Sequence, residues 1–234
     1  EVPTSIRPPV QAAGFVPVVV GTAPVNLASD PKVNEPVLCY TYDEAVAALG
    51  FSKDFANYTL CEHIYAQFAL FAVAPVVFIN VLDPAVHNTS VTAEAATLVD
   101  GQVKTAVDGA LKNTLVVKSG DGVTTYVLNT DYLAAFNNAG ELVITRVVGG
   151  AIPADNSELQ LDYDHLDPSA IDSNDIIGGI DVNGKATGLE LINEVFPRFR
   201  LVPTHGLAPK WSTDPAVTAV GSAKMLKIHG NFPG

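Results

Sequence analysis

The sequence predicts an α/β layer that is interrupted by an inserted antiparallel β-domain, so that the chain is α+β overall. Two apolar strand patterns with helical patterns between them occupy residues 15–82. Short strand patterns separated by Gly, Asp and Asn follow between residues 113 and 163, and helical patterns return after residue 188. Alternating strands and helices are typical of an α/β layer, whereas closely spaced short strands are typical of an antiparallel sheet.

The first part of the chain contains the expected elements of the α/β layer. The run FVPVVV at 15–20 predicts a buried strand, and 36–40 is a second strand-like run. Residues 42–50 predict a short helix with an acidic first turn and a terminal glycine. A longer helix is expected at about 54–72, with apolar side chains at helical spacing, and a buried strand at 76–82.

The middle of the chain predicts the inserted domain. Strands are expected at 113–118, 123–128, 141–148 and 157–163, and Ser119–Gly120–Asp121–Gly122 has the composition of a hairpin turn.

The last part returns to helical patterns at Gly188–Phe196 and Asp214–His229, with a strand-like run at Arg200–Pro203 between them. The predicted map is therefore an extended arm at 1–14, an α/β domain at 15–90 plus 170–234, and an inserted β-domain at 91–169.

Composition excludes several classes of partner. The chain has 234 residues, a formal net charge of −12 and only 16% charged residues. An acidic chain is a poor ligand for nucleic acid or for an anionic membrane. No run approaches the roughly 18 apolar residues of a membrane span. Cys39 and Cys61 are interpreted as buried thiols, with a disulfide or a nucleophile as the alternatives.

Charge is divided between two neighbouring blocks. Residues 155–194 contain ten acids and one base, whereas residues 195–234 contain five bases and one acid. Two explanations stay open: chance combined with solvation, or an acidic surface of one copy that meets a basic surface of the next.

Motifs for chemistry are missing from the sequence. No glycine-rich phosphate loop and no nucleophile elbow occurs, and the histidines lack the spacing of a zinc site. Asp162–Asp167 (DYDHLD) places oxygen ligands at alternate positions, as a calcium loop does, but it lacks the central glycine and closing glutamate, so an exposed acidic turn is the alternative. We predict no catalytic residue, metal or cofactor.

Motifs in order along the chain carry a resemblance. They are Glu1–Pro8 (EVPTSIRP), Val20–Pro24 (VGTAP), Asn34–Leu38 (NEPVL), Tyr42–Ala45 (YDEA), Leu49–Gly50 (LG), Tyr163–Ser169 (YDHLDPS), Gly206–Ser212 (GLAPKWS) and Asp214–Val217 (DPAV). Together they resemble the contractile tail sheath proteins of bacteriophages and related injection machines.

The resemblance implies a fold and a function. The fold is a subtilisin-like layer without proteolytic activity, carrying an inserted β-domain. Subunits of this family form hexameric rings that stack around a tail tube and contract to drive the tube through the target envelope. The implied partners are further copies, the tube protein, and baseplate and tail terminator proteins. The implied location is the tail of a virion or of a phage-tail-like particle, assembled in the bacterial cytoplasm.

The resemblance also implies extended terminal arms that add strands to neighbouring subunits. Glu1, Val2, Pro3, Ile6 and Arg7 are the candidate arm residues at the interface. The family's C-terminal domain is expected to be missing from this chain. The alternatives are a surface protein whose β-domain binds a receptor or glycan and, less favoured, a serine hydrolase on the same layer.

Overall fold

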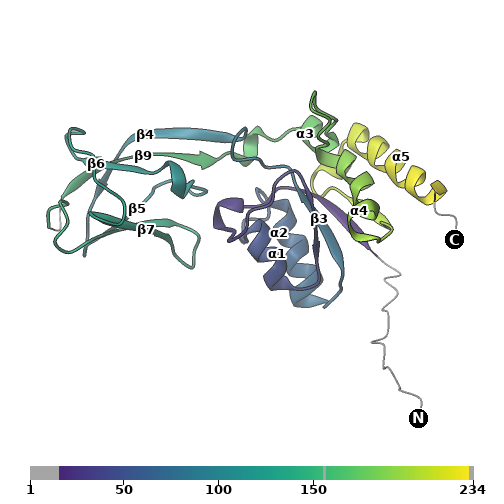
Figure 1. Ribbon diagram of the computed structural model, residues 1–234, viewed down its shortest axis with the longest axis horizontal. Helices are drawn as coiled ribbons and strands as arrows, with labels where there is room; N and C mark the ends of the chain where they lie inside the picture. The colour runs from purple at the N-terminus through teal and green to yellow at the C-terminus, as the bar shows by residue number, and fades with distance from the viewer. Residues whose placement is uncertain (1–15, 155–156, 232–234) are drawn as a thin grey trace, which may run out of the picture.

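The computed structural model describes residues 16–154 and 157–231, which form two lobes (Figure 1). We call residues 16–87 and 167–231 the mixed lobe and the parts of 88–166 that are described the β lobe. The mixed lobe contains β1 (Pro17–Gly21), η1 (Val25–Leu27), β2 (Pro36–Cys39), α1 (Tyr42–Leu49), α2 (Thr59–Ile64), η2 (Tyr65–Leu70), β3 (Val76–Asn80), η4 (Pro168–Ala170), α3 (Ser173–Ile177), η5 (Gly188–Leu191), α4 (Ile192–Phe199), β10 (His205–Leu207), η6 (Trp211–Thr213) and α5 (Pro215–Asn231). The β lobe contains β4 (Asn88–Thr97), β5 (Gln102–Lys104), η3 (Lys112–Thr114), β6 (Val116–Ser119), β7 (Tyr132–Phe136), β8 (Leu142–Arg146) and β9 (Glu158–Leu166).

The mixed lobe is built on a four-stranded sheet in the order β10-β1-β3-β2. Strands β10, β1 and β3 are parallel, and β2 runs antiparallel to β3. Every residue of β1 and β3 is buried. This is expected of strands that are covered on both faces, which read as continuous apolar runs.

Alternate side chains of these strands enter two separate cores. Val18 and Val77 belong to a core that includes η5 and α4, whereas Val19 and Phe78 belong to a core that includes α1 and α2. Figure 1 shows α1 and α2 on one side of β3, and α4 and α5 on the other. The sheet is therefore the shared wall between two apolar layers.

Local sequence explains how the helices around the sheet begin and end. Thr41 caps α1 by accepting a hydrogen bond from the Glu44 N–H at 3.2 Å, and the Glu44 carboxylate accepts the Thr41 N–H in return. Gly50 ends α1 with a φ of +73°, which glycine adopts without strain. Helix α2 begins at Thr59, later than the predicted start near residue 54, and continues into the π-helix η2.

The β lobe contains two three-stranded antiparallel sheets, β4-β9-β6 and β5-β8-β7. Its core includes Val117, Leu161 and Tyr163 from the first sheet and Tyr132 and Ile144 from the second. Apolar side chains on the facing sides of the two sheets therefore share one core, separate from the two cores of the mixed lobe.

Two predicted strands are wrong. Residues 123–128 make only isolated bridges, to Lys118 and Tyr132, and after Tyr126 the Val127 N–H donates to the Asp131 carboxylate at 2.8 Å instead of to a strand partner. The strand of this region is β7 instead. Arg200–Pro203 is not a strand either: Arg200 has a φ of +59° and ends α4, so the strand begins at His205.

Strand β4 was not predicted, although it is the longest strand of the described residues, at ten residues. Its sequence, NTSVTAEAAT, is polar and rich in alanine, so it lacks a strand pattern. It pairs with β9 along its length, with a bulge between Val91 and Glu94. The Ala93 N–H at this bulge donates to Asp162 Oδ1 at 2.6 Å.

Candidate functional site

The predicted arm residues Glu1, Val2, Pro3, Ile6 and Arg7 lie outside the described residues. The structure does describe where the chain enters the mixed lobe. The Val16 N–H donates to Thr204 Oγ1 at 2.9 Å, and the Thr204 N–H donates to Val16 O at 3.0 Å. This reciprocal pair fixes the entry point beside the first residue of β10.

The acidic run at 162–167 does not form a metal site. Asp162 accepts hydrogen bonds from the Ala93 N–H and from Lys118 Nζ, Asp164 accepts one from Ser90 Oγ, and Asp167 caps the turn at Ser169. The bond from the Ala93 N–H, and after it the one from Lys118, lowers the pKa of Asp162. No three His, Cys, Asp or Glu side chains among the described residues could hold a metal ion together. The carboxylates instead tie β9 to β4 and β6 and shape the turn that follows.

His87 is the buried histidine at the junction of the lobes. Its Nδ1 accepts the Asp83 N–H at 3.1 Å, and its Nε2 lies 3.6 Å from Asp175 Oδ1 on α3. A serine hydrolase needs a histidine nitrogen beside its serine hydroxyl, but both ring nitrogens of His87 face other groups. The backbone carbonyl of His87 accepts the Asp167 N–H at 2.9 Å, which joins the two chain segments that connect the lobes.

Cys39 and Cys61 are free and buried, so the disulfide alternative is wrong. Burial raises the pKa of each thiol to about 12. At neutral pH both are therefore protonated, and neither has the thiolate character that a nucleophile requires.

The two charge blocks are partly neutralised within one chain. Lys224 on α5 forms an ion pair with Glu190, and Arg198 pairs with Glu194 at 2.6 Å and reaches Glu35 at 3.6 Å. Two of the five bases after residue 194 are thus balanced inside the fold. Less charge is left for a contact between copies than the sequence alone indicates.

The lobes also touch away from their connecting strands, at Leu27. A Cβ placed on Gly140, in the β7–β8 turn, would lie 3.0 Å from Leu27 Cδ1. Asn26 Nδ2 donates to Ala110 O at 3.3 Å beside it. Three open grooves of about 320, 550 and 620 Å³ surround this contact, and Leu27 lines all of them. Leu111 of the β lobe is itself buried in a core of the mixed lobe, so the second contact joins a small apolar insertion to open grooves around Leu27.

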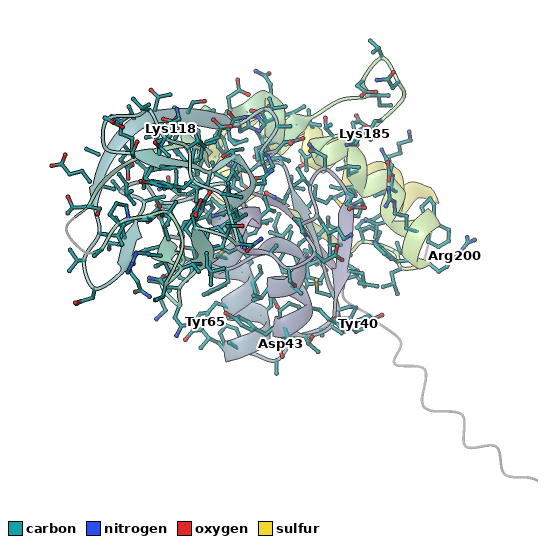
Figure 2. The ribbon with its side chains drawn as sticks, turned by 60° about the vertical axis from the view of Figure 1, so that its left-hand side comes forward. Tyr40, Asp43, Tyr65, Lys118, Lys185 and Arg200 are labelled. Carbon is teal, nitrogen blue, oxygen red and sulfur yellow. The ribbon has the colours of Figure 1, made fainter. Side chains whose placement is uncertain are left out.

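Exposed apolar side chains gather at one end of the four-stranded sheet. The exposed fractions are 54% for Tyr40, 41% for Tyr65, 57% for Leu70 and 71% for Phe71. We call these four residues the aromatic edge. Tyr40 directly follows β2, and Leu70 and Phe71 precede β3, whose first residue is paired with the last residue of β2. Figure 2 shows Tyr40, Asp43 and Tyr65 along one rim of the molecule.

The aromatic edge was not predicted from the sequence. Tyr65 has the helical spacing of Tyr58 and Cys61 before it, and the helix expected at about 54–72 counts all three among its apolar side chains. In the structure the helix widens into a π-helix from Tyr65 onward, so the repeat that aligned Tyr65 with its buried neighbours no longer holds. No local signal in the sequence announces this change.

No helix among the described residues is both long and apolar enough to cross a membrane.

Comparison with curated proteins finds a phage protein to which this chain is similar. No protein family model matches the chain. The chain is 32% identical to the tail sheath protein of Burkholderia phage BcepMu over 233 residues, which cover 97% of this chain and 45% of that protein. It therefore spans less than half the length of the relative it matches. The resemblance predicted from the motifs is confirmed: the chain is similar in sequence to a phage tail sheath protein.

Proposed function

We propose that this chain is part of the structural subunit of a contractile tail sheath. The observation that carries the proposal is the 32% identity to a phage tail sheath protein along 97% of the chain. In this proposal the subunits form stacked hexameric rings around a tail tube, and contraction drives the tube through the envelope of the target cell. The other partners are the baseplate and tail terminator proteins, the location is the virion tail, and the subunits assemble in the bacterial cytoplasm.

The physical character of the chain supports a structural role. A sheath subunit needs rigid bodies and surfaces that can pair in more than one arrangement. The described residues form well-buried cores in both lobes. Large apolar side chains are exposed on both lobes as well, including Phe71 on the mixed lobe and Val123 and Val148 on the β lobe. We propose no enzymatic activity, because the sheath role requires none.

The fold assignment belongs to the same proposal. We propose that the mixed lobe is the α/β, subtilisin-like layer of the sheath family and that the β lobe is its inserted antiparallel domain. In support, the chain leaves the mixed lobe after residue 87 and returns to it at residue 167, so that the mixed lobe is discontinuous in sequence.

Electron microscopy of the reading frame that contains this chain tests the proposed function. We expect hollow tubes or stacked rings in negative stain, and we expect them to disappear when residues 1–14 are deleted. Some sheaths assemble only on a template, so the protein is also mixed with purified tail tube. A protein that stays dispersed in the presence of the tube would contradict the proposal.

A further inference from the structure

The aromatic edge lies at the end of the sheet where the chain enters. Strand β1 is separated from β2 by β3 alone, and neighbouring strands lie about 4.8 Å apart. The entry point at Val16 and the end of β2 are therefore about 10 Å apart across the sheet. An extended chain covers about 3.3 Å per residue, so three or four residues bridge this separation. The residues that precede Val16 are thus long enough to lie along the whole edge.

The composition of residues 1–15 suits an aromatic surface. The segment contains Pro3, Pro8 and Pro9, together with Val2 and Ile6, which are apolar. Proline has no N–H to donate and favours the polyproline II conformation, so this segment is a poor strand for the interior of a sheet. Proline-rich segments in that conformation are bound by surfaces lined with aromatic side chains. Three of the four side chains of the aromatic edge are aromatic.

One side chain of the segment, Arg7, can form charged contacts at the same edge. Asp43 and Glu62 are exposed beside Tyr40 and Tyr65, respectively, in the sequence. The single lysine or arginine between residues 36 and 82 is Lys53, which follows the opposite end of α1. The N-terminal segment carries one acid, Glu1, and one base, Arg7, and Arg7 can pair with these carboxylates or stack on a tyrosine ring.

We propose that the proline-rich residues 1–15 dock on the aromatic edge of their own chain. Attachment at Val16 gives the segment an effective concentration of the order of millimolar at the edge. A contact with a dissociation constant of about 1 mM would then be occupied about half of the time. The docking itself does not depend on the proposed function. If the chain is a sheath subunit, the segment has to leave this edge before it can join a neighbour.

Paramagnetic relaxation in the complete chain tests the proposal. A nitroxide is attached to Ser5→Cys, because the native Cys39 and Cys61 are buried and protonated and will not be labelled. We expect the amide signals of Tyr65 and Phe71 to lose most of their intensity. The amide signal of Arg200, which follows α4 on the other side of the sheet, should lose several-fold less intensity. Equal loss on both sides of Val16 would overturn the proposal.

Two further samples separate the possible outcomes. The double variant Tyr65→Ser/Phe71→Ser should abolish the preferential loss, whereas the matched pair Val123→Ser/Val148→Ser, which changes two exposed apolar side chains on the β lobe, should leave it unchanged. Mixing spin-labelled chain with isotope-labelled chain that lacks the nitroxide reports contacts between copies. If the amide signals of Tyr65 and Phe71 lose intensity only in that mixture, the segment binds a second copy. That result would overturn docking within one chain.

Discussion

Asn80→Ala should destabilise the mixed lobe strongly. Asn80 is completely buried at the end of β3, and its Oδ1 accepts the N–H of Ala23 at 3.0 Å and of Leu82 at 3.1 Å. Alanine leaves both donors without this acceptor, and an unpaired buried donor costs about 1–3 kcal/mol. Water entering the small cavity would reduce the total, so we expect a loss of about 2–4 kcal/mol. This is a large part of the roughly 5–15 kcal/mol that stabilises a typical domain.

Urea denaturation followed by tryptophan fluorescence measures this loss. Trp211 is the single tryptophan, and it packs against a core of the mixed lobe. With a denaturant slope of about 2 kcal/mol per molar, the midpoint should fall by about 1–2 M while the slope stays unchanged. The control is Asn193→Ala, which removes an exposed asparagine from the same lobe. If Asn80→Ala lowers the midpoint no more than Asn193→Ala does, the argument from the two hydrogen bonds is wrong.

Three other measurements test the packing and the charges of the fold. Cys39 and Cys61, whose pKa values burial raises to about 12, should not react with a thiol reagent at pH 8 until the chain is unfolded in urea; rapid labelling of the native chain would contradict their burial. Asp162 has a lowered pKa in the folded chain, so its contribution to stability is complete above its ordinary pKa of about 3.9 and is lost as pH falls through the folded value. Asp162→Asn should therefore flatten the acid limb of the stability profile, and an unchanged limb would argue against this carboxylate. Gly50→Ala should lower the melting temperature by several degrees more than Gly149→Ala does. Both glycines have positive φ, but a Cβ on Gly50 would lie 2.1 Å from Pro24 O, whereas a Cβ on Gly149 would meet nothing within 4 Å. Equal shifts in melting temperature would refute this steric argument.

The sequence was most informative where a local pattern and the tertiary environment agree. The apolar runs at β1 and β3 are buried on both faces, so their patterns are continuous and unambiguous. Helix α1 carries its own capping box and its own terminal glycine, and its predicted limits of 42–50 differ from the observed ones by a single residue. In both cases the information lies within the element itself.

The prediction failed where structure depends on a distant partner. Strand β4 is held by β9, about 70 residues later, and nothing in its own polar sequence shows this. The region at 123–128 has β-branched residues, but Asp131 takes one of its backbone donors. The aromatic edge needs β2 and η2 to end where β3 begins, which is a property of the sheet register.

The pairing of β4 with β9 has a consequence for protein engineering. Asn88 and Leu166 are directly opposite each other where the two strands enter the mixed lobe, and opposite residues of an antiparallel pair have Cα atoms about 5 Å apart. A two-residue hairpin turn closes such a gap. Residues 88 and 166 are thus the natural limits for replacing the whole β lobe by a short turn or by a foreign domain. The four strands of the mixed lobe lie outside these limits, so the exchange leaves their pairing untouched.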